Sequence, residues 1–373
     1  MVGLFTRSTK ETMPEPLKNL YNTQLVKALC RELENQLPDF DSKGFTQSVF
    51  DSHWENKELK ERMAHISESL CNFIPSHYAE TLIILKAIAP KFAGFEYMFF
   101  PGFVELYGMD DYKNSIVALE HFTEHSSSEF AVRPFIKKYN KKMISQMGKW
   151  AESSNHHVRR LATEGCRPRL PWAMALPQFK NDPGPILPIL DKLKNDQSEY
   201  VRRSVANNLN DISKDNPAIV IEIARNWLGK NKETDWVVKH GCRTLLKQGV
   251  PEIMDLFGFN NPQHITIKSF RVQKKTTLGD SLKFEFALHT KKQTLGKLRI
   301  EYAISFLKKN GTHSRKVFKI SEAKIQDREK KVIKHHSFKI ISTRKYYPGT
   351  HALAIICNGH ELAHREFHLL SYN

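Results

Sequence analysis

Three carboxylates and one indole are the side chains of this sequence best suited to chemistry: Glu129, Glu164, Asp211 and Trp172. Carboxylates can orient a water molecule and stabilise positive charge, and the face of an indole attracts cations. The sequence has no glycine-rich phosphate loop, His-Glu-x-x-His motif, cysteine pair or nucleophile elbow. Its 17 histidines are scattered, so we expect neither a metal site nor a cofactor.

Residues 155–172 gather several of these groups into a short span. Apolar side chains recur there at the spacing of an amphipathic helix: Val158, Leu161, Ala162 and Gly165. A polar stripe on the opposite side consists of His156, Arg160 and Glu164. We expect this stripe to stand away from the core. The helix should end near Gly165, because Pro168 disfavours helical geometry at the residue before it.

Each candidate also has a purely structural explanation. Glu129 could be a favourable acid in the first turn of a helix. Glu164 could form an exposed pair with Arg160, although the order Arg before Glu is the less favourable one. Asp211 lies near a predicted helix end, where the helix dipole disfavours an acid. Trp172 follows a proline in a loop and could simply pack against its neighbours.

The elements that must position these residues are helices with short breaks, from residue 15 to residue 255. Helical spacing covers the segments 17–37, 55–73, 76–91, 113–124, 134–152, 186–194, 199–213, 217–229 and 235–247. The triplet Val158-Arg159-Arg160 recurs 43 residues later as Val201-Arg202-Arg203, a spacing typical of HEAT-type helical pairs. A second polar stripe, Arg203, Asn207 and Asp211, accompanies the second copy. Stacked pairs would place both stripes on one concave surface.

Alternation replaces helical spacing after residue 263. Candidate strands are 264–273, 282–288, 298–306, 315–325, 331–341, 350–357 and 361–369. Seven short strands in such a span suit an immunoglobulin-like sandwich. We therefore predict an all-α plus all-β protein: a HEAT-like helical solenoid at 1–256, a linker at 257–263 and a basic β-sandwich at 264–373.

Charge is distributed unevenly along the chain. The formal net charge is +17, and residues 260–373 hold 23 Lys and Arg against 8 Asp and Glu. This excess favours nucleic acid as a partner, although solubility or a lipid surface would also fit. Five widely spread cysteines suggest a reduced compartment. Since neither a membrane span nor a signal peptide is evident, we expect a cytoplasmic protein.

Several long motifs resemble one known family. They are His157-Val-Arg-Arg-Leu-Ala-Thr-Glu-Gly-Cys-Arg-Pro-Arg-Leu-Pro-Trp-Ala-Met-Ala-Leu176, Ser128-Glu-Phe-Ala-Val-Arg-Pro-Phe135, Val201-Arg-Arg-Ser-Val-Ala-Asn-Asn-Leu-Asn-Asp211 and Glu15-Pro-Leu-Lys-Asn-Leu-Tyr21. They look like the signature of the AlkC branch of the AlkC/AlkD superfamily, whose members are bacterial DNA glycosylases built of HEAT-like repeats. Members with a carboxy-terminal immunoglobulin-like domain are the most similar. The resemblance implies removal of 3-methyladenine and 3-methylcytosine from alkylated DNA without full base flipping.

The resemblance also assigns roles to residues of this chain. Glu129, Glu164 and Asp211 match an acidic catalytic cluster, Trp172 matches an aromatic wall, and Arg160 matches the arginine beside the acids. Glu164 and Asp211 would orient the water and stabilise charge, and Glu129 would face the cationic base. No lysine is a candidate for Schiff-base chemistry, so the enzyme would be monofunctional.

The expected partner is double-stranded alkylated DNA, bound by a monomer. Candidate DNA contacts in the helical part are Arg159, Arg167, Arg169 and Arg203, of which Arg167 and Arg203, like Arg160, could instead orient the acids. Candidates in the sandwich loops are Lys274, Lys275, Lys291, Lys292, Arg344 and Lys345. The alternative is a non-catalytic HEAT-repeat protein that binds DNA or acts as a scaffold.

Overall fold

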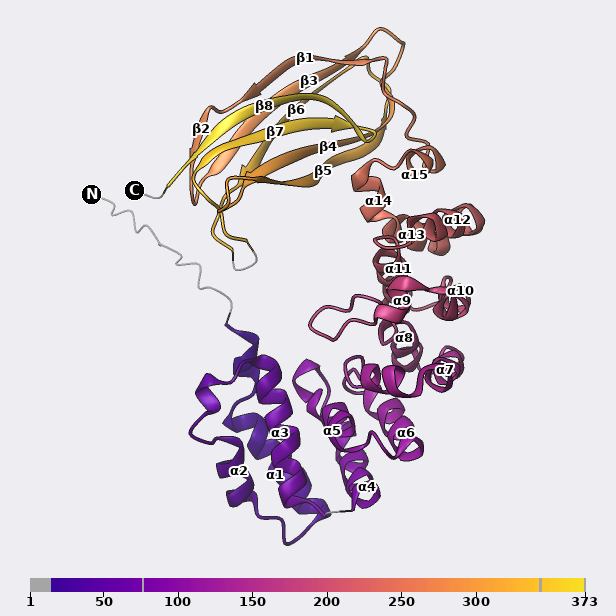
Figure 1. Ribbon diagram of the computed structural model, residues 1–373, viewed down its shortest axis with the longest axis vertical. Helices are drawn as coiled ribbons and strands as arrows, with labels where there is room; N and C mark the ends of the chain where they lie inside the picture. Colours follow the sequence, from indigo (N-terminus) through magenta and orange to yellow (C-terminus); the bar gives the residue numbers. More distant parts are fainter. Residues whose placement is uncertain (1–14, 76, 342–343, 372–373) are drawn as a thin grey trace, which may run out of the picture. The chain divides into compact units, whose positions relative to one another are not determined.

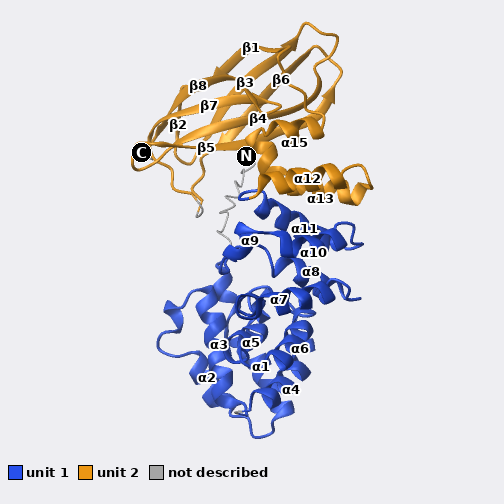
Figure 2. Cartoon of the chain, turned by 45° about the vertical axis from the view of Figure 1, so that its right-hand side comes forward, with its two compact units in different colours: residues 1–215 blue, residues 216–373 orange. Residues whose placement is uncertain are grey.

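The computed structural model describes residues 15–75, 77–341 and 344–371. It divides into two compact units between Asp215 and Asn216 (Figure 2). The last helix nevertheless ends at Leu256 and the first strand begins at Ile265, so the second unit contains both helices and strands (Figure 1). The division into compact units thus differs from the predicted change of domain between 256 and 264, which stays a prediction.

The first unit consists of helices joined by short turns. They are α1 (Thr23–Gln36), α2 (Ser42–Val49), α3 (Leu59–Phe73), α4 (Tyr78–Ile88), α5 (Phe99–Tyr107), α6 (Tyr112–Thr123), α7 (Val132–Trp150), α8 (His156–Glu164), α9 (Pro177–Asn181), α10 (Leu187–Leu193) and α11 (Glu199–Ile212). Three of these helices, α2, α5 and α9, were not predicted from the sequence. α5 is apolar almost throughout, so it lacks the polar face that marks an amphipathic helix.

The 43-residue recurrence corresponds to a repeated hydrogen-bonding device. Arg159 in α8 donates from Nη1 to the carbonyl oxygens five and six residues before it, at 2.8 and 3.0 Å. Arg202 in α11 donates to the equivalent carbonyls at 3.0 and 2.6 Å. The middle residue of each Val-Arg-Arg triplet therefore fixes the turn that leads into its own helix. This shared geometry supports the interpretation of the triplets as a structural repeat.

Helix α8 contacts α7 and α11 and also α6 and α10. Val158, Leu161 and Ala162 are fully buried, as their spacing predicted. The expectation that the opposite stripe stands away from the core was wrong for Glu164, which is only 4% exposed. Because Ser204 of α11 donates a hydrogen bond to Glu164 at 2.6 Å, this carboxylate lies inside the seam between two repeats.

The second unit begins with four helices and continues as a sandwich of eight strands. Its helices are α12 (Pro217–Trp227), α13 (Lys232–Gly241), α14 (Arg243–Gln248) and α15 (Pro251–Leu256). Its strands are β1 (Ile265–Val272), β2 (Lys275–Thr277), β3 (Ser281–Thr290), β4 (Gly296–Leu307), β5 (His313–Ile325), β6 (Glu329–Ser337), β7 (Gly349–Cys357) and β8 (His360–Leu370). The predicted helix 235–247 is in fact two helices, broken at Cys242, and the three-residue β2 was not predicted.

The sandwich has a three-stranded sheet in the order β1-β3-β6 and a five-stranded sheet in the order β2-β8-β7-β4-β5. All pairings are antiparallel except β2 with β8. The alternating apolar residues of β3 and β4 form its core: Leu282, Phe284, Phe286, Leu288, Leu298, Ile300, Tyr302, Ile304 and Phe306. The predicted fold class, helical repeats followed by an immunoglobulin-like sandwich, is confirmed. None of the helices in the described ranges is long and apolar enough to cross a membrane.

A buried group of charges joins the helices of the second unit to its sandwich. Arg299 on β4 donates to Glu301 at 2.6 Å and to Glu322 at 3.2 Å. Lys239 on α13 forms an ion pair with the same Glu322. A second link is a close approach between Gly249, after α14, and Gly359, in the turn between β7 and β8. These contacts explain why α12 to α15 form one compact unit with the strands.

Because the two glycines lie so close together, adding one methyl group at Gly249 should lower the free energy of unfolding. At Gly249, φ is +70° and a Cβ atom would lie 2.8 Å from the Cα of Gly359. Gly229 has a similar φ of +81° but has no atom within 4 Å of an added Cβ. We expect Gly229→Ala to cost about 1 kcal/mol of unfolding free energy, from the left-handed backbone alone. Gly249→Ala should cost roughly 1–3 kcal/mol more, because the sandwich and the helices must separate.

Denaturant unfolding of both variants measures this difference. If both variants lose the same free energy of unfolding, the added methyl group at Gly249 does not clash with Gly359, and the loss comes from the left-handed backbone alone.

Candidate active site

Five charged side chains of the first unit form one row of ion pairs, in the order Glu129, Arg160, Glu164, Arg167 and Asp211. Arg160 contacts Glu129 and lies 3.4 Å from Glu164. Arg167 lies 2.6 Å from Glu164 through Nη1 and 2.8 Å from Asp211 through Nε. The three predicted acids are thus brought together, with one arginine between each neighbouring pair.

Four different parts of the fold supply this row. Glu129 lies in the turn before α7, Arg160 and Glu164 in α8, Arg167 in the following loop and Asp211 in the last turn of α11. The alternative explanation of Glu129 as an acid in the first turn of a helix does not hold, because α7 begins only at Val132. Hydroxyl and ammonium groups complete the partners of the acids. Ser127 donates to Glu129 at 2.9 Å, Ser204 to Glu164 at 2.6 Å and Lys214 to Asp211 at 3.0 Å.

The electrostatics of Glu164 depend on its two arginines. Burial alone raises the pKa of this carboxyl, but the charges of Arg160 and Arg167 and the hydrogen bond from Ser204 outweigh that effect. The pKa of Glu164 is therefore lowered from its ordinary value, and the group is ionised at neutral pH. For Arg160 and Arg167, burial lowers the pKa, but the neighbouring carboxylates raise it to a greater extent.

Arg133 of α7 holds the loop that carries Arg167. This side chain is fully buried, and it donates to the carbonyl oxygens of Gly165, Arg167 and Met174 at 2.9, 2.9 and 2.7 Å. Burial lowers the pKa of Arg133 to about 10, so it remains charged at neutral pH. Three carbonyls that converge on one guanidinium fix the path of residues 165–174. Arg133 therefore positions Arg167, although the sequence analysis did not single it out.

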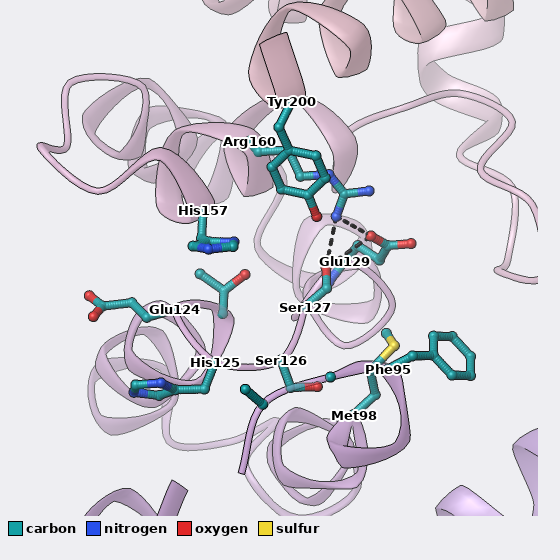
Figure 3. Close-up of a pocket in the computed structure, with 13 residues that line it drawn as sticks. Phe95, Met98, Glu124, His125, Ser126, Ser127, Glu129, His157, Arg160 and Tyr200 are labelled. Carbon is teal, nitrogen blue, oxygen red and sulfur yellow. Dashed lines mark hydrogen bonds and ion pairs between the residues drawn. The ribbon is translucent and has the colours of Figure 1, made fainter. Parts of the chain in front are cut away.

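A half-open cavity of about 610 Å³ lies beside one end of the row. Glu129, Arg160 and Tyr200 line it together with Ala93, Gly94, Phe95, Met98, Thr123, Glu124, His125, Ser126, Ser127 and His157 (Figure 3). Neither Glu164 nor Asp211 lines this cavity, and they are only 4% and 2% exposed. The side chain of Glu129 is 16% exposed, and its Oε1 accepts no hydrogen bond within the described ranges. Of the three predicted acids, Glu129 is therefore the one with an oxygen available to a ligand in the cavity, which Glu124 also lines.

Trp172 lies outside the cavity lining, on the loop after α8. It is 60% exposed and has a φ of +62°, an uncommon backbone conformation for a bulky residue. Lys60 of α3 donates to its carbonyl oxygen at 2.9 Å, and the edge of its ring meets Phe95 at a centroid distance of 6.1 Å. Since Phe95 also lines the cavity, it connects Trp172 with the space beside Glu129. A strained backbone held by surrounding contacts is typical of a functional position.

Tyr200 of α11 is a further site residue that the sequence analysis missed. The Arg160 guanidinium carbon lies 4.8 Å from the centre of its ring, and the ring covers Arg160 where it faces the cavity (Figure 3). Burial raises the pKa of Tyr200, so the phenol is neutral at physiological pH. Its only signal in the sequence is its position directly before the second Val-Arg-Arg triplet.

The basic residues predicted to contact DNA lie in different environments. Arg159 is buried and forms a two-pronged pair with Asp196, which disfavours a contact with DNA. Arg167 is enclosed by the acids. Arg169 pairs with Asp215 in a partly exposed position, and Arg203 pairs with Glu199 on the surface. Among the predicted DNA contacts of the sandwich, five have exposed side chains: Lys274, Lys275, Lys291, Lys292 and Lys345.

Arg344, the remaining candidate of the sandwich, is partly covered. Its guanidinium carbon lies 4.3 Å from the centre of the Phe306 ring, so the side chain stacks on an aromatic surface of its own unit.

The lowered pKa of Glu164 predicts a pH-dependent contribution to stability. The ionised form is favoured in the folded state, so its contribution is complete above the unfolded pKa of about 4.3 and is lost as pH falls through the lower folded value. We expect Glu164→Gln to cost about 3 kcal/mol near pH 7, because two buried arginines lose a charged partner. The difference in Tm between the wild type and Glu164→Gln should shrink below about pH 4.

Thermal unfolding at several pH values tests this expectation. Glu199→Gln, which breaks an exposed pair with Arg203, is the matched control and should change Tm little at any pH. If the difference in Tm between the wild type and Glu164→Gln stays constant from pH 7 to pH 3, the ionised form of Glu164 does not provide the stabilisation.

Two family models and a bacterial protein match this chain. A family model described as "DNA alkylation repair enzyme" matches residues 121–245, and one described as "Uncharacterised protein YhaZ, C-terminal Ig-like domain" matches residues 266–371. Uncharacterized protein YhaZ of Bacillus subtilis (strain 168) is 46% identical over 345 residues, which are 92% of this chain and 96% of that protein.

A solved structure resembles nearly the whole chain. It is the alkylpurine DNA glycosylase AlkC of Pseudomonas fluorescens, bound to DNA containing an abasic site analog. The TM-score is 0.91 at 36% identity, and the match covers 95% of this chain and 99% of that one. Fold, length and domain order agree throughout. The chain therefore belongs to the AlkC-type family of DNA alkylation repair enzymes, with a helical-repeat region followed by a YhaZ-type immunoglobulin-like domain.

Proposed function

We propose that this protein is a monofunctional DNA glycosylase that releases 3-methyladenine and 3-methylcytosine from alkylated duplex DNA. The observation that carries the proposal is the position of Glu129, whose free carboxylate oxygen lies at a cavity large enough to admit a base. Family membership and the DNA-bound state of AlkC support the same conclusion.

The chemistry of the substrate fits such a site. Methylation at N3 makes adenine or cytosine cationic, so the base leaves as a neutral molecule and needs little help from a general acid. The bond between C1′ and the base nitrogen breaks, and the electron pair of that bond stays with the base. A water oxygen then bonds to C1′ and its proton passes to a carboxylate or to solvent. The task left to the protein is to bind the cationic base and to stabilise the positive charge that develops on the sugar as the bond breaks.

We assign the direct contact with the cationic base to Glu129. Its Oε2 is held by Arg160 and Ser127, whereas Oε1 accepts no hydrogen bond within the described ranges, and the residue lines the cavity. A carboxylate fixed in this way needs no reorganisation as charge changes in the substrate, which is the source of electrostatic catalysis. The neutral histidines of the cavity do not oppose a cation, since burial lowers the pKa of His125 and His157.

Glu164 and Asp211 are proposed to stabilise the developing positive charge on the sugar and to orient the attacking water. Both carboxylates are almost fully buried, and both contact Arg167. Arg167 is therefore proposed to orient the acids rather than to contact phosphate.

We propose that the lesion stays close to the duplex and is not fully flipped. Trp172 projects from its loop with most of its indole exposed, and it does not close the cavity. An exposed indole can pack against a base or sugar at the surface of the duplex and attract a cationic base through its face. The buried acids Glu164 and Asp211 likewise lie outside the cavity lining that a fully extruded base would meet.

The proposed activity predicts release of free methylated bases. We expect the wild type to release 3-methyladenine and 3-methylcytosine from methylated duplex DNA without cleaving the strand. Glu129→Gln and Asp211→Asn should each lower single-turnover rates by about 10²–10³-fold, because a positioned electrostatic group is lost. Chromatography of the released bases measures both results.

Glu199→Gln changes an exposed acid on the same helix as Asp211 and serves as the control, with an unchanged rate expected. If the wild type releases no methylated base but binds DNA, the chain is a non-catalytic DNA-binding or scaffold protein instead.

Restricted flipping predicts a small fluorescence response. We expect little increase when the protein binds a duplex carrying 2-aminopurine next to an abasic-site analogue, since neighbouring bases remain stacked. A large increase on binding, together with quenching by added acrylamide, would show extrusion of bases and contradict this part of the proposal.

A further inference from the structure

The second unit contains a cationic groove whose lining includes none of the predicted DNA contacts. It has a volume of about 790 Å³ and lies where α13 and α14 meet β4 and β5, all within the orange unit of Figure 2. Its lining consists of Trp236, Lys239, His240, Arg243, Leu246, Lys247, Arg299, Tyr302, Lys316, Val317, Phe318 and Lys319. Six of these are Lys or Arg, and none is an acid. We call this surface the α14–β5 groove.

Internal acids neutralise only part of this charge. Glu301 and Glu322 pair with Arg299, and Glu322 also pairs with Lys239. Lys247 and Lys316 form no ion pair with any acid of the described ranges, and both are exposed. The two lysines come from different elements, α14 and β5, so the fold itself places them on one groove.

The two lysines repel each other in the unbound protein. Burial lowers the pKa of Lys316, and the positive charges of Arg344 and Lys247 lower it further. Like charges held together without an acid destabilise the free protein, and a bound anion would relieve the repulsion. The arrangement is therefore that of an anion site whose ligand bridges a helix and a strand.

The rim of the groove indicates which anion fits. Trp236 is stacked on His240 with ring centroids 5.0 Å apart and an interplanar angle of 5°, so one face of its indole is already covered. Its remaining surface offers apolar contact to a sugar rather than a slot between two bases. Several separate cations beside an apolar rim match consecutive phosphates and deoxyriboses of a nucleic-acid strand.

We propose that the α14–β5 groove binds the phosphodiester backbone of duplex DNA, with Lys247 and Lys316 as its principal phosphate contacts. The choice of duplex DNA rests on the proposed function. The groove lies at the junction of the last helices with the sandwich, not in the loops that carry Lys274, Lys275, Lys291 and Lys292.

The test compares two double variants of the full-length protein, both with a charge change of −2. Lys247→Gln with Lys316→Gln removes the groove contacts. Lys283→Gln with Lys334→Gln removes two exposed lysines from β3 and β6, in the three-stranded sheet, and is the matched control. The probe is an unmodified, fluorescently labelled duplex, and its Kd is measured by anisotropy over a range of NaCl concentrations.

We expect the groove variant to bind about 10-fold more weakly at moderate salt, with the slope of log affinity against log salt reduced by about 1.8, since two phosphate contacts are lost. The control should keep the wild-type slope. The control should keep the wild-type Tm, and the groove variant should have an equal or slightly higher Tm, because the repulsion between its two lysines is removed.

An unchanged slope in the groove variant, or an equal loss in the control, overturns the proposal. Base release from methylated DNA is measured in parallel to separate the two proposals. A wild type that binds the duplex through these lysines but releases no base refutes the glycosylase activity and leaves the groove assignment in place.

Discussion

The site depends on one buried guanidinium, that of Arg167, which lies between the carboxylates of Glu164 and Asp211. Burial of two carboxylates costs several kcal/mol per charge in lost hydration, and the guanidinium between them offsets part of that cost. Arg167 itself sits on a loop, and Arg133 holds that loop through three carbonyl contacts. The geometry of the acids is thus set by an arginine on another helix that touches neither of them.

The features that could be predicted from the sequence are those that depend on the spacing of residues close together in the chain. Apolar periodicity placed α8 and its end at Gly165, and alternation placed the core residues of β3 and β4. The Val-Arg-Arg triplets pointed to the repeat, because their middle arginines hold carbonyls only five and six residues away. Because these contacts join residues only five and six positions apart, two copies of the same motif can form the same contacts.

Long-range contacts explain what spacing could not predict. Glu164 looks exposed on a single helix, and it is buried only because Ser204 arrives from the next repeat, forty residues later. Arg159 carries the same charge as Arg160 and is its neighbour, yet it points into a pair with Asp196. The break at Cys242 and the cavity beside Glu129 likewise depend on how separate helices pack. Binary patterning carries no information about which neighbour covers a polar side chain.

The same packing resolves a conflict between attracting DNA and presenting acids to it. Exposed carboxylates would repel phosphates, but Glu164 and Asp211 are each paired with Arg167 inside the fold, so their charge is compensated within a few ångströms. Unpaired lysines on the surface, such as Lys247 and Lys316, act instead over about 8 Å in physiological salt. Attraction is therefore long-ranged and the acidic field is short-ranged. Only a group that already lies beside Glu129 experiences the field of this carboxylate. The site therefore attracts a cationic base more strongly than the phosphate backbone to which the base is attached.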